Sequence, residues 1–360
     1  MALDIRIEKI AKSRVDEIDF HNIPFGKVFT DHMLEADYVD GKWTNVVIRP
    51  FANLSIHPGN AALHYGQSIF EGMKANRSAD GNPLLFRAHK HVDRINASAR
   101  RMCMPEVPEE LFMEGLKKLV YLDKNWIPDV AGCSLYIRPF LFATDEFLGV
   151  RASETYKFMI LLLPVGAYYS APVKLKAEEK YVRAVQGGVG EAKTSGNYAA
   201  SLLPAQEAKA QGYDQVMWLD GKEFKYIQEV GTMNIFFVVG NKILTPETDG
   251  AILKGITRDS ILHILKDKGY DVETRPITIE EIMQAGKTGE LKEVFGAGTA
   301  AVIAYVSELK YKNDIINLDA KQFQIAPMLY DTIQGLKTQT LPDKFGWVEE
   351  VTADEPNFAV

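Results

Sequence analysis

The sequence predicts an α+β protein built from two domains. Its 360 residues exceed the size of a typical single domain. Hydrophobic residues make up 46% of the chain and charged residues 25%, the balance of a globular protein with a sizeable core. Short β-rich runs and segments of helical periodicity are interspersed in both halves. A polar, proline-bearing stretch at 170–181 is expected to link a smaller domain, 1–169, to a larger one, 182–360.

The first half is expected to place helices on a mostly antiparallel sheet. Residues 1–20 are charged and weakly patterned, so we interpret them as a peripheral segment. Apolar residues recur at helical spacing over 89–102, and again over 109–120 behind Pro108. Further segments have the composition of strands: 27–30, 43–48, 84–87, 134–142 and 156–165.

The pattern of β-rich and helical segments in the second half predicts another α+β unit. Asp220-Gly221 is a hairpin signal between β-rich runs at 215–219 and 224–229. Other strands are expected at 235–239, 242–244 and 293–295. Helices are expected over 199–211, 258–268, 279–285 and 327–336.

Charge and cysteine content narrow the function classes. A formal net charge of −7 argues against nucleic acid or an anionic membrane as the main partner. The two cysteines fit a reducing compartment, and the N-terminus lacks the apolar core of a signal peptide. The longest apolar run, 158–165, is too short to span a bilayer, and the histidines lack the spacing of metal ligands. We therefore expect a cytoplasmic enzyme without a metal site.

One glycine-rich segment, GGVGEAKTSGNY at 187–198, surrounds a single lysine. Its glycines allow backbone angles that other residues avoid, and they let a ligand approach the main chain. Lys193 is a candidate for Schiff-base chemistry, which requires that desolvation or nearby cations lower the pKa of the amine. From the segment alone, a solvated lysine in a surface loop is equally consistent.

Three other features are candidates for binding or proton transfer. Tyr198 follows the lysine and could exchange a proton with a ligand, although packing is the commoner role of such a tyrosine. Glu229 ends a strand, where it could stabilise a cationic ring nitrogen or simply be solvated. Tyr136 and Arg138 share one face of an apolar strand, and the arginine needs a carboxylate there, either in a fixed ion pair or on a substrate.

Glycine-containing turns offer possible sites for an anion. Thr257 precedes a predicted helix, so its hydroxyl and the neighbouring N–H groups could face a phosphate. The turn FGAGTA at 295–300 offers amides for a phosphate or a carboxylate, and Arg87 at a strand end could add a bidentate contact. Each signal is weak by itself because such turns commonly cap helices.

Taken together and in order, these segments resemble the branched-chain amino acid aminotransferases, which have the two-domain class IV (fold type IV) fold of pyridoxal 5'-phosphate (PLP) enzymes. The resemblance runs from about residue 25 to beyond residue 340. It rests on the motifs FGKVFTDHML, HYGQSIFEGMKA, LFR, SLYIRP, FLGV, LLPVGAYY, GGVGEAKTSGNY, EVGTMNIF, GITR and VFGAGTAAV. It implies a homodimer.

The resemblance also implies a role for each candidate. Lys193 matches the lysine that binds PLP as a Schiff base and transfers protons, Tyr198 the tyrosine beside the phenolic oxygen, and Glu229 the acid at the pyridine nitrogen. The positions that match phosphate-binding residues are Arg87, Ile256, Thr257 and Thr299. The residues expected to line the substrate pocket are Phe25, Tyr65, Phe70, Tyr136, Arg138, Val150, Tyr168, Thr299 and Ala300.

The activity implied is reversible, ping-pong transamination of L-leucine, L-isoleucine and L-valine with 2-oxoglutarate, giving branched 2-oxo acids and L-glutamate. Aromatic walls would bury the branched side chain, and Arg138 would bind the side-chain carboxylate of glutamate. The loop at 148–150 would reach the active site of the partner subunit. Ala301 and Ala304 stand where some animal members have a Cys-x-x-Cys centre, so thiol control of that kind is not expected.

Two alternatives stay open. A D-amino acid aminotransferase or a PLP-dependent lyase would share the fold, because a few pocket residues set the substrate range. A regulatory protein that binds a phosphate ligand would keep the fold without catalysis. The joint presence of Lys193, Tyr198 and Glu229 counts against the second alternative.

Overall fold

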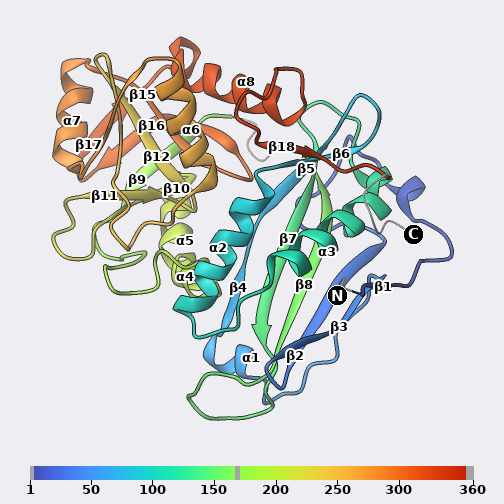
Figure 1. Cartoon of the computed structure of the whole chain (residues 1–360). Helices are drawn as coiled ribbons and strands as arrows, with labels where there is room; N and C mark the ends of the chain where they lie inside the picture. Colours follow the sequence, from blue (N-terminus) through green and yellow to red (C-terminus); the bar gives the residue numbers. More distant parts are fainter. Residues whose placement is uncertain (1–3, 167–170, 354–360) are drawn as a thin grey trace. The chain divides into compact units, whose positions relative to one another are not determined.

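The computed structural model describes residues 4–166 and 171–353, and the chain forms two compact units (Figure 1). Unit 1 comprises the described residues of Met1–Tyr168, Ala192–Ser195 and Gln334–Val360. Unit 2 comprises those of Tyr169–Glu191 and Gly196–Ile333. The expected domains, 1–169 and 182–360, differ from these units because the lysine segment and the C-terminal residues pack within unit 1.

Unit 1 is built on a nine-stranded sheet that is almost wholly antiparallel, as expected. The strand order is β1 (Arg6–Ile7), β3 (Lys42–Pro50), β2 (His32–Val39), β8 (Tyr156–Val165), β7 (Ser134–Ala143), β5 (Met73–Arg77), β6 (Pro83–Phe86) and β18 (Val348–Glu350), and β4 (Ser68–Phe70) pairs with β7. Among the described pairs of this sheet, β1 with β3 is the parallel one.

Two amphipathic helices, α2 (Ala88–Arg101) and α3 (Glu109–Leu122), lie across one face of this sheet (Figure 1). Their apolar faces, including the fully buried Phe112, form the core of unit 1 with the strands. Gly115 lets α3 approach β2 closely, because a Cβ at this position would lie 2.4 Å from Leu34 Cδ1. The shorter helical segments of unit 1 are η1 (Val15–Glu17), α1 (Ala61–Tyr65) and η2 (Lys124–Trp126).

Unit 2 has a mixed sheet of nine strands. The order is β11 (Ile227–Val230), β10 (Gln215–Leu219), β9 (Val173–Ala177), β16 (Val302–Tyr311), β15 (Leu291–Gly298), β12 (Asn234–Val239), β13 (Lys242–Thr245) and β14 (Asp271–Thr274), and β17 (Asp314–Asn317) pairs with β16. Its helical segments are α5 (Leu202–Ala210), α6 (Ile256–Asp267), α7 (Ile279–Thr288) and η3 (Ala320–Gln322). Helices α4 (Ser195–Ala200) and α8 (Ile325–Lys337) include residues of both units.

The stretch expected to be a linker, 170–181, instead contains strand β9 inside the unit 2 sheet, parallel to β10 and β16. Val173, Leu175 and Ala177 are buried, whereas Lys174 and Lys176 alternate with them towards solvent. This period of two marks a strand with one buried face, and the lysines disguise it in the overall composition.

Over residues 4–166 and 171–353, no helix is both long enough and apolar enough to cross a membrane.

Candidate active site

The segment that carries Lys193 is anchored in unit 1 by its main chain. The N–H of Phe70 donates to the carbonyl of Lys193 at 3.0 Å, and the N–H of Lys193 donates to Ser98 Oγ at 2.9 Å. The hydroxyl of Thr194 donates to the carbonyl of Ser68 at 2.8 Å. The lysine therefore starts from a backbone fixed between β4 and α2, which argues against the alternative of a solvated surface loop.

The surroundings of the Lys193 amine lower its pKa from 10.5 to about 8. Desolvation is the main cause because it disfavours the charged form, and the positive charge of Arg94 acts in the same direction. The amine nitrogen lies 4.8 Å from the centroid of the Phe70 ring. A pKa near 8 leaves part of the amine uncharged near neutral pH, as a nucleophile or a proton-accepting base requires.

Four residues expected in the substrate pocket lie together in unit 1. Arg138 Nη2 donates to Tyr136 Oη at 3.0 Å, and the Arg138 guanidinium lies 4.5 Å from the centroid of the Phe70 ring. Phe25 packs edge-on against Tyr136, with ring centroids 5.9 Å apart. The Nε atom of Arg138 is buried without a hydrogen-bond partner among the described residues. Of the two partners considered for this arginine, a substrate carboxylate is thus favoured over a fixed ion pair.

Arg87 stands at the N-terminus of α2, where its backbone is left-handed with φ of 53°. Its N–H donates to the carbonyl of Trp347 at 2.7 Å, and its guanidinium lies 4.7 Å from the Trp347 ring. The side chain is therefore ordered at a helix N-terminus, a position that favours an anion.

Three further pocket residues are predicted in the first half. Tyr65 is exposed, and Val150 is 92% exposed. Tyr168 lies outside the described residues.

In unit 2, Glu229 and Tyr198 line one small cavity together with Arg183 and Thr232. Glu229 Oε1 accepts from the N–H of Leu253 at 2.7 Å, and Oε2 lies 3.2 Å from Arg183 Nε. Both side chains of this ion pair are almost fully buried. The structure therefore brings two of the predicted residues together and excludes the alternative of a solvated Glu229.

The predicted anion cradles of unit 2 have different surroundings. Ile256 and Thr257 are buried in the first turn of α6, whose N-cap Gly255 has no side chain with which to cap the free N–H groups. Thr299 and Ala300 lie in the turn between β15 and β16. A Cβ on Gly298 would lie 3.1 Å from Met233 Cγ, a contact that Met233 would have to relieve by a small shift.

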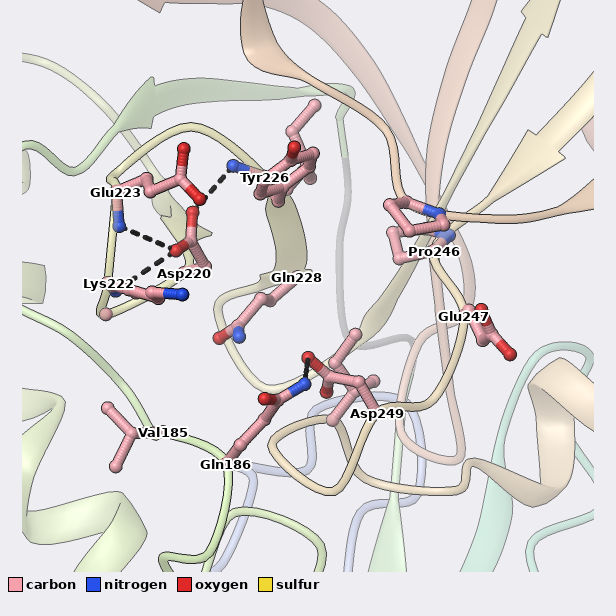
Figure 2. Close-up of a pocket in the computed structure, with 14 residues that line it drawn as sticks. Val185, Gln186, Asp220, Lys222, Glu223, Tyr226, Gln228, Pro246, Glu247 and Asp249 are labelled. Carbon is pink, nitrogen blue, oxygen red and sulfur yellow. Dashed lines mark hydrogen bonds between the residues drawn. The ribbon is translucent and has the colours of Figure 1, made fainter.

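A larger hollow of about 640 Å³ lies elsewhere in unit 2 (Figure 2). Gln228, Ile252 and Pro246 are buried in its wall, while Glu223 and Glu247 are exposed at its edge. None of the residues predicted for the active site lines it. Since strand neighbours face opposite sides of a sheet, Gln228 turns towards this hollow while Glu229 turns away from it.

Sequence reasoning misses Glu71, His91, Arg94 and Ser98, which surround the Lys193 segment. The last three recur at positions i, i+3 and i+7 of α2, so they place polar groups on one helix face. The helical spacing of the polar stripe can be read from the sequence, but the sequence does not show that Glu71 is its partner. Among the described residues, no three or more His, Cys, Asp or Glu side chains are grouped so as to hold a metal ion.

Comparisons with known proteins identify the family. Residues 68–309 match the family described as amino-transferase class IV. The chain is 49% identical to branched-chain-amino-acid aminotransferase 2 of Bacillus subtilis over 97% of each chain, and 44% identical to the branched-chain-amino-acid aminotransferase of Mycolicibacterium smegmatis over 94% of this chain and 95% of that one.

Solved structures show the same fold. A T.th. branched-chain amino acid aminotransferase, complexed with N-(5'-phosphopyridoxyl)-L-glutamate, aligns with a TM-score of 0.71 at 29% identity, over 88% of this chain and 98% of that one. The Escherichia coli branched-chain amino acid aminotransferase aligns with a TM-score of 0.70 at 26% identity, over 89% of this chain and 99% of that one. The fold, the anchored lysine and these matches together place the chain in the class IV aminotransferase family.

Proposed function

We propose that this chain is a PLP-dependent branched-chain aminotransferase that exchanges the amino group of L-leucine, L-isoleucine or L-valine with 2-oxoglutarate. The observation that carries the proposal is Lys193, whose main chain is fixed and whose amine has a pKa lowered to about 8. The names of the relatives, at 49% and 44% identity along nearly the whole chain, support the substrate class.

The residues of this chain fit PLP. Lys193 offers an amine that can lose its proton, and Glu229 offers a carboxylate that would suit a protonated ring nitrogen. Arg87 would contribute positive charge, and the first turn of α6 at Thr257 would contribute N–H groups, both for the phosphate. When bound, PLP supplies the electron sink that stabilises the carbanion left when the substrate Cα loses its proton.

Lys193 would move the proton during the reaction. Its amine must be uncharged to accept the Cα proton and charged to return it, and a pKa near 8 makes both states accessible near neutral pH. Because the backbone is fixed to Phe70 and Ser98, only the side chain has to move between these positions.

One pocket would serve two kinds of side chain. The rings of Phe25, Phe70 and Tyr136 would bury a branched apolar group, which gains free energy from leaving water. Arg138 lies against two of these rings and has a buried Nε without a described partner, so it would bind the side-chain carboxylate of glutamate or 2-oxoglutarate.

A homodimer would complete this pocket. Leu148 and Val150 are 63% and 92% exposed at a loop, and large apolar side chains gathered at a loop tip are typical of a contact surface. We propose that this loop enters the active site of the partner subunit. A chain that sediments as a monomer and still shows full turnover would contradict this.

Borohydride reduction of the PLP-loaded chain, followed by peptide mapping, tests the assignment of the lysine. The pyridoxyl label is expected on Lys193; it should be lost in Lys193→Ala and kept in Lys292→Ala, which changes an exposed lysine of unit 2. Turnover of leucine, isoleucine, valine and D-alanine with 2-oxoglutarate tests the substrate. Preference for D-alanine would favour the D-amino acid aminotransferase, and label on another residue would overturn the role of Lys193.

A further inference from the structure

A buried, hydrogen-bonded group of three ionisable side chains lies beside the Lys193 segment in unit 1. Glu71 is fully buried, and its two oxygens accept from Arg94 Nε at 2.6 Å and Nη2 at 2.8 Å. His91 Nδ1 lies 2.7 Å from Glu71 Oε2, and the His91 side chain is only 3% exposed. We call Glu71, His91 and Arg94 the acid–base cluster.

The acid–base cluster and the lysine are held by the same two elements. Glu71 directly follows Phe70, whose N–H binds the carbonyl of Lys193. Arg94 precedes Ser98 by one helical turn of α2, and Ser98 binds the N–H of Lys193. The cluster therefore has a fixed relation to the lysine backbone, which a salt bridge placed only for stability would not need.

The charges within the cluster follow from its partners. Arg94 and His91 hold the pKa of Glu71 far below its usual value, against the effect of burial, so Glu71 is ionised. Burial lowers the pKa of His91, and the interaction with Glu71 only partly offsets this. His91 is thus uncharged near neutral pH, and its Nδ1–H donates to the ionised carboxylate. The cluster consists of one negative and one positive charge.

Groups from three elements act on the Lys193 amine within unit 1. Arg94 on α2 disfavours its charged form, and Glu71 after β4 favours it less strongly. On β7, Tyr136 favours the charged form and Arg138 disfavours it. His91 on α2 also interacts with the lysine. Arg94 is therefore the strongest of the charges that oppose protonation of the amine.

We infer that Glu71 and Arg94 are positioning residues for Lys193: the two hydrogen bonds to Glu71 hold the Arg94 guanidinium one helical turn from Ser98, which binds the lysine main chain, and so keep one positive charge beside the lysine segment. This rests on the proposed function for its use in catalysis, because an uncharged amine is what the proton transfer requires. The two members of the ion pair have opposite effects on the amine, and that opposition separates the inference from a purely structural role.

The direction in which each substitution should shift the pKa of Lys193 follows from the charge that it removes. Arg94→Gln removes a positive charge and leaves the Glu71 carboxylate, so the pKa of Lys193 should rise by about one unit. Glu71→Gln keeps an amide oxygen that can accept from Arg94 and removes only the counter-charge, so the pKa of Lys193 should fall. Arg94→Lys keeps the charge and should stay closer to the unmodified chain than Arg94→Gln. If the ion pair only stabilised the fold, neither substitution would shift the pKa of Lys193.

Two readouts on the full-length chain test this. In the chain freed of PLP, trace acetylation with acetic anhydride between about pH 6 and pH 10, quantified on the Lys193 peptide by mass spectrometry, gives the pKa of the free amine. In the PLP-loaded chain, the pH midpoint of the change in visible absorbance should move in the same direction. The first readout does not depend on PLP, so it distinguishes failure of this inference from failure of the proposed function.

The chain supplies a matched control. Arg49 and Glu35 form a similar two-bond ion pair in unit 1, at 2.6 and 3.2 Å, and they are not among the charges with the largest effects on the Lys193 amine. Arg49→Gln and Glu35→Gln should leave the acetylation midpoint of Lys193 unchanged. Circular dichroism checks that each variant folds, and Arg94→Lys against Arg94→Gln still tests the sign if Glu71→Gln does not fold. Shifts of the same sign in Glu71→Gln and Arg94→Gln, or no shift in Arg94→Gln, would overturn the inference.

Discussion

Replacing Arg138 by glutamine should separate the two substrates of the proposed reaction. The substitution removes the charge that lies 4.5 Å from the Phe70 ring while keeping a polar group near Tyr136 Oη. Glutamate would lose a charge-assisted bond to its side-chain carboxylate, whereas leucine would lose only packing against the arginine. Lys193 and its backbone bonds are untouched.

The structure sets the size of the effect. A hydrogen bond to a charged group contributes about 1.5–3 kcal/mol, which corresponds to roughly 10-fold to 150-fold in kcat/KM. Arg138 is half-buried, so the loss for glutamate should lie in the lower part of this range, near 10-fold to 50-fold. For leucine we expect a change of no more than about 3-fold, since no charged bond is lost.

Single-turnover measurements of the two half-reactions, each followed by the cofactor absorbance, give kcat/KM for glutamate and for leucine separately. Arg100→Gln is the control, because it removes the same charge from an exposed pair with Glu106. Equal losses for both substrates in Arg138→Gln would refute the assignment of Arg138 to the glutamate carboxylate.

Three further outcomes concern stability. Gly115→Ala should lower the free energy of unfolding by about 1–3 kcal/mol in urea titrations, because its Cβ would lie 2.4 Å from Leu34 Cδ1; an unchanged midpoint would mean that α3 and β2 can separate freely. Folding lowers the pKa of the Glu71 carboxyl, so the ionised carboxylate stabilises the fold fully above the unfolded pKa of about 4.5. This stabilisation should be lost as the pH falls below about 4.5, and urea titrations between about pH 3 and pH 6 would detect the loss. Burial lowers the pKa of Lys337 from 10.5 to about 7, so between these pH values the unfolded chain binds more protons and the free energy of unfolding should rise with pH. Lys337→Met should raise the free energy of unfolding at pH 7 by about 1–4 kcal/mol and flatten its rise with pH. A variant less stable than the unmodified chain would contradict this expectation.

Local patterns predicted the elements, whereas long-range pairing determined the surroundings of the site. The amphipathic spacing at 109–120 is confirmed as α3, and the Asp220-Gly221 turn as the connection from β10 to β11. The lysines of β9 concealed an alternation that only sheet pairing revealed. Glu71 and Arg94 are distant from Lys193 in the sequence, so the local sequence does not indicate that they lie near it in the fold.

One glycine of the Lys193 segment, Gly190, has a packing role. A Cβ on Gly190 would lie 2.3 Å from the carbonyl oxygen of Ala251 and 2.5 Å from Ala184 Cβ, so this glycine is required by packing within unit 2. Lys193 itself is fixed at its main chain by Phe70 and Ser98 within unit 1. In the proposed reaction, only the lysine side chain would have to move to transfer a proton. It would then meet the same charges at every turnover, so Arg94 and Glu71 would adjust an ionisation that burial already lowers.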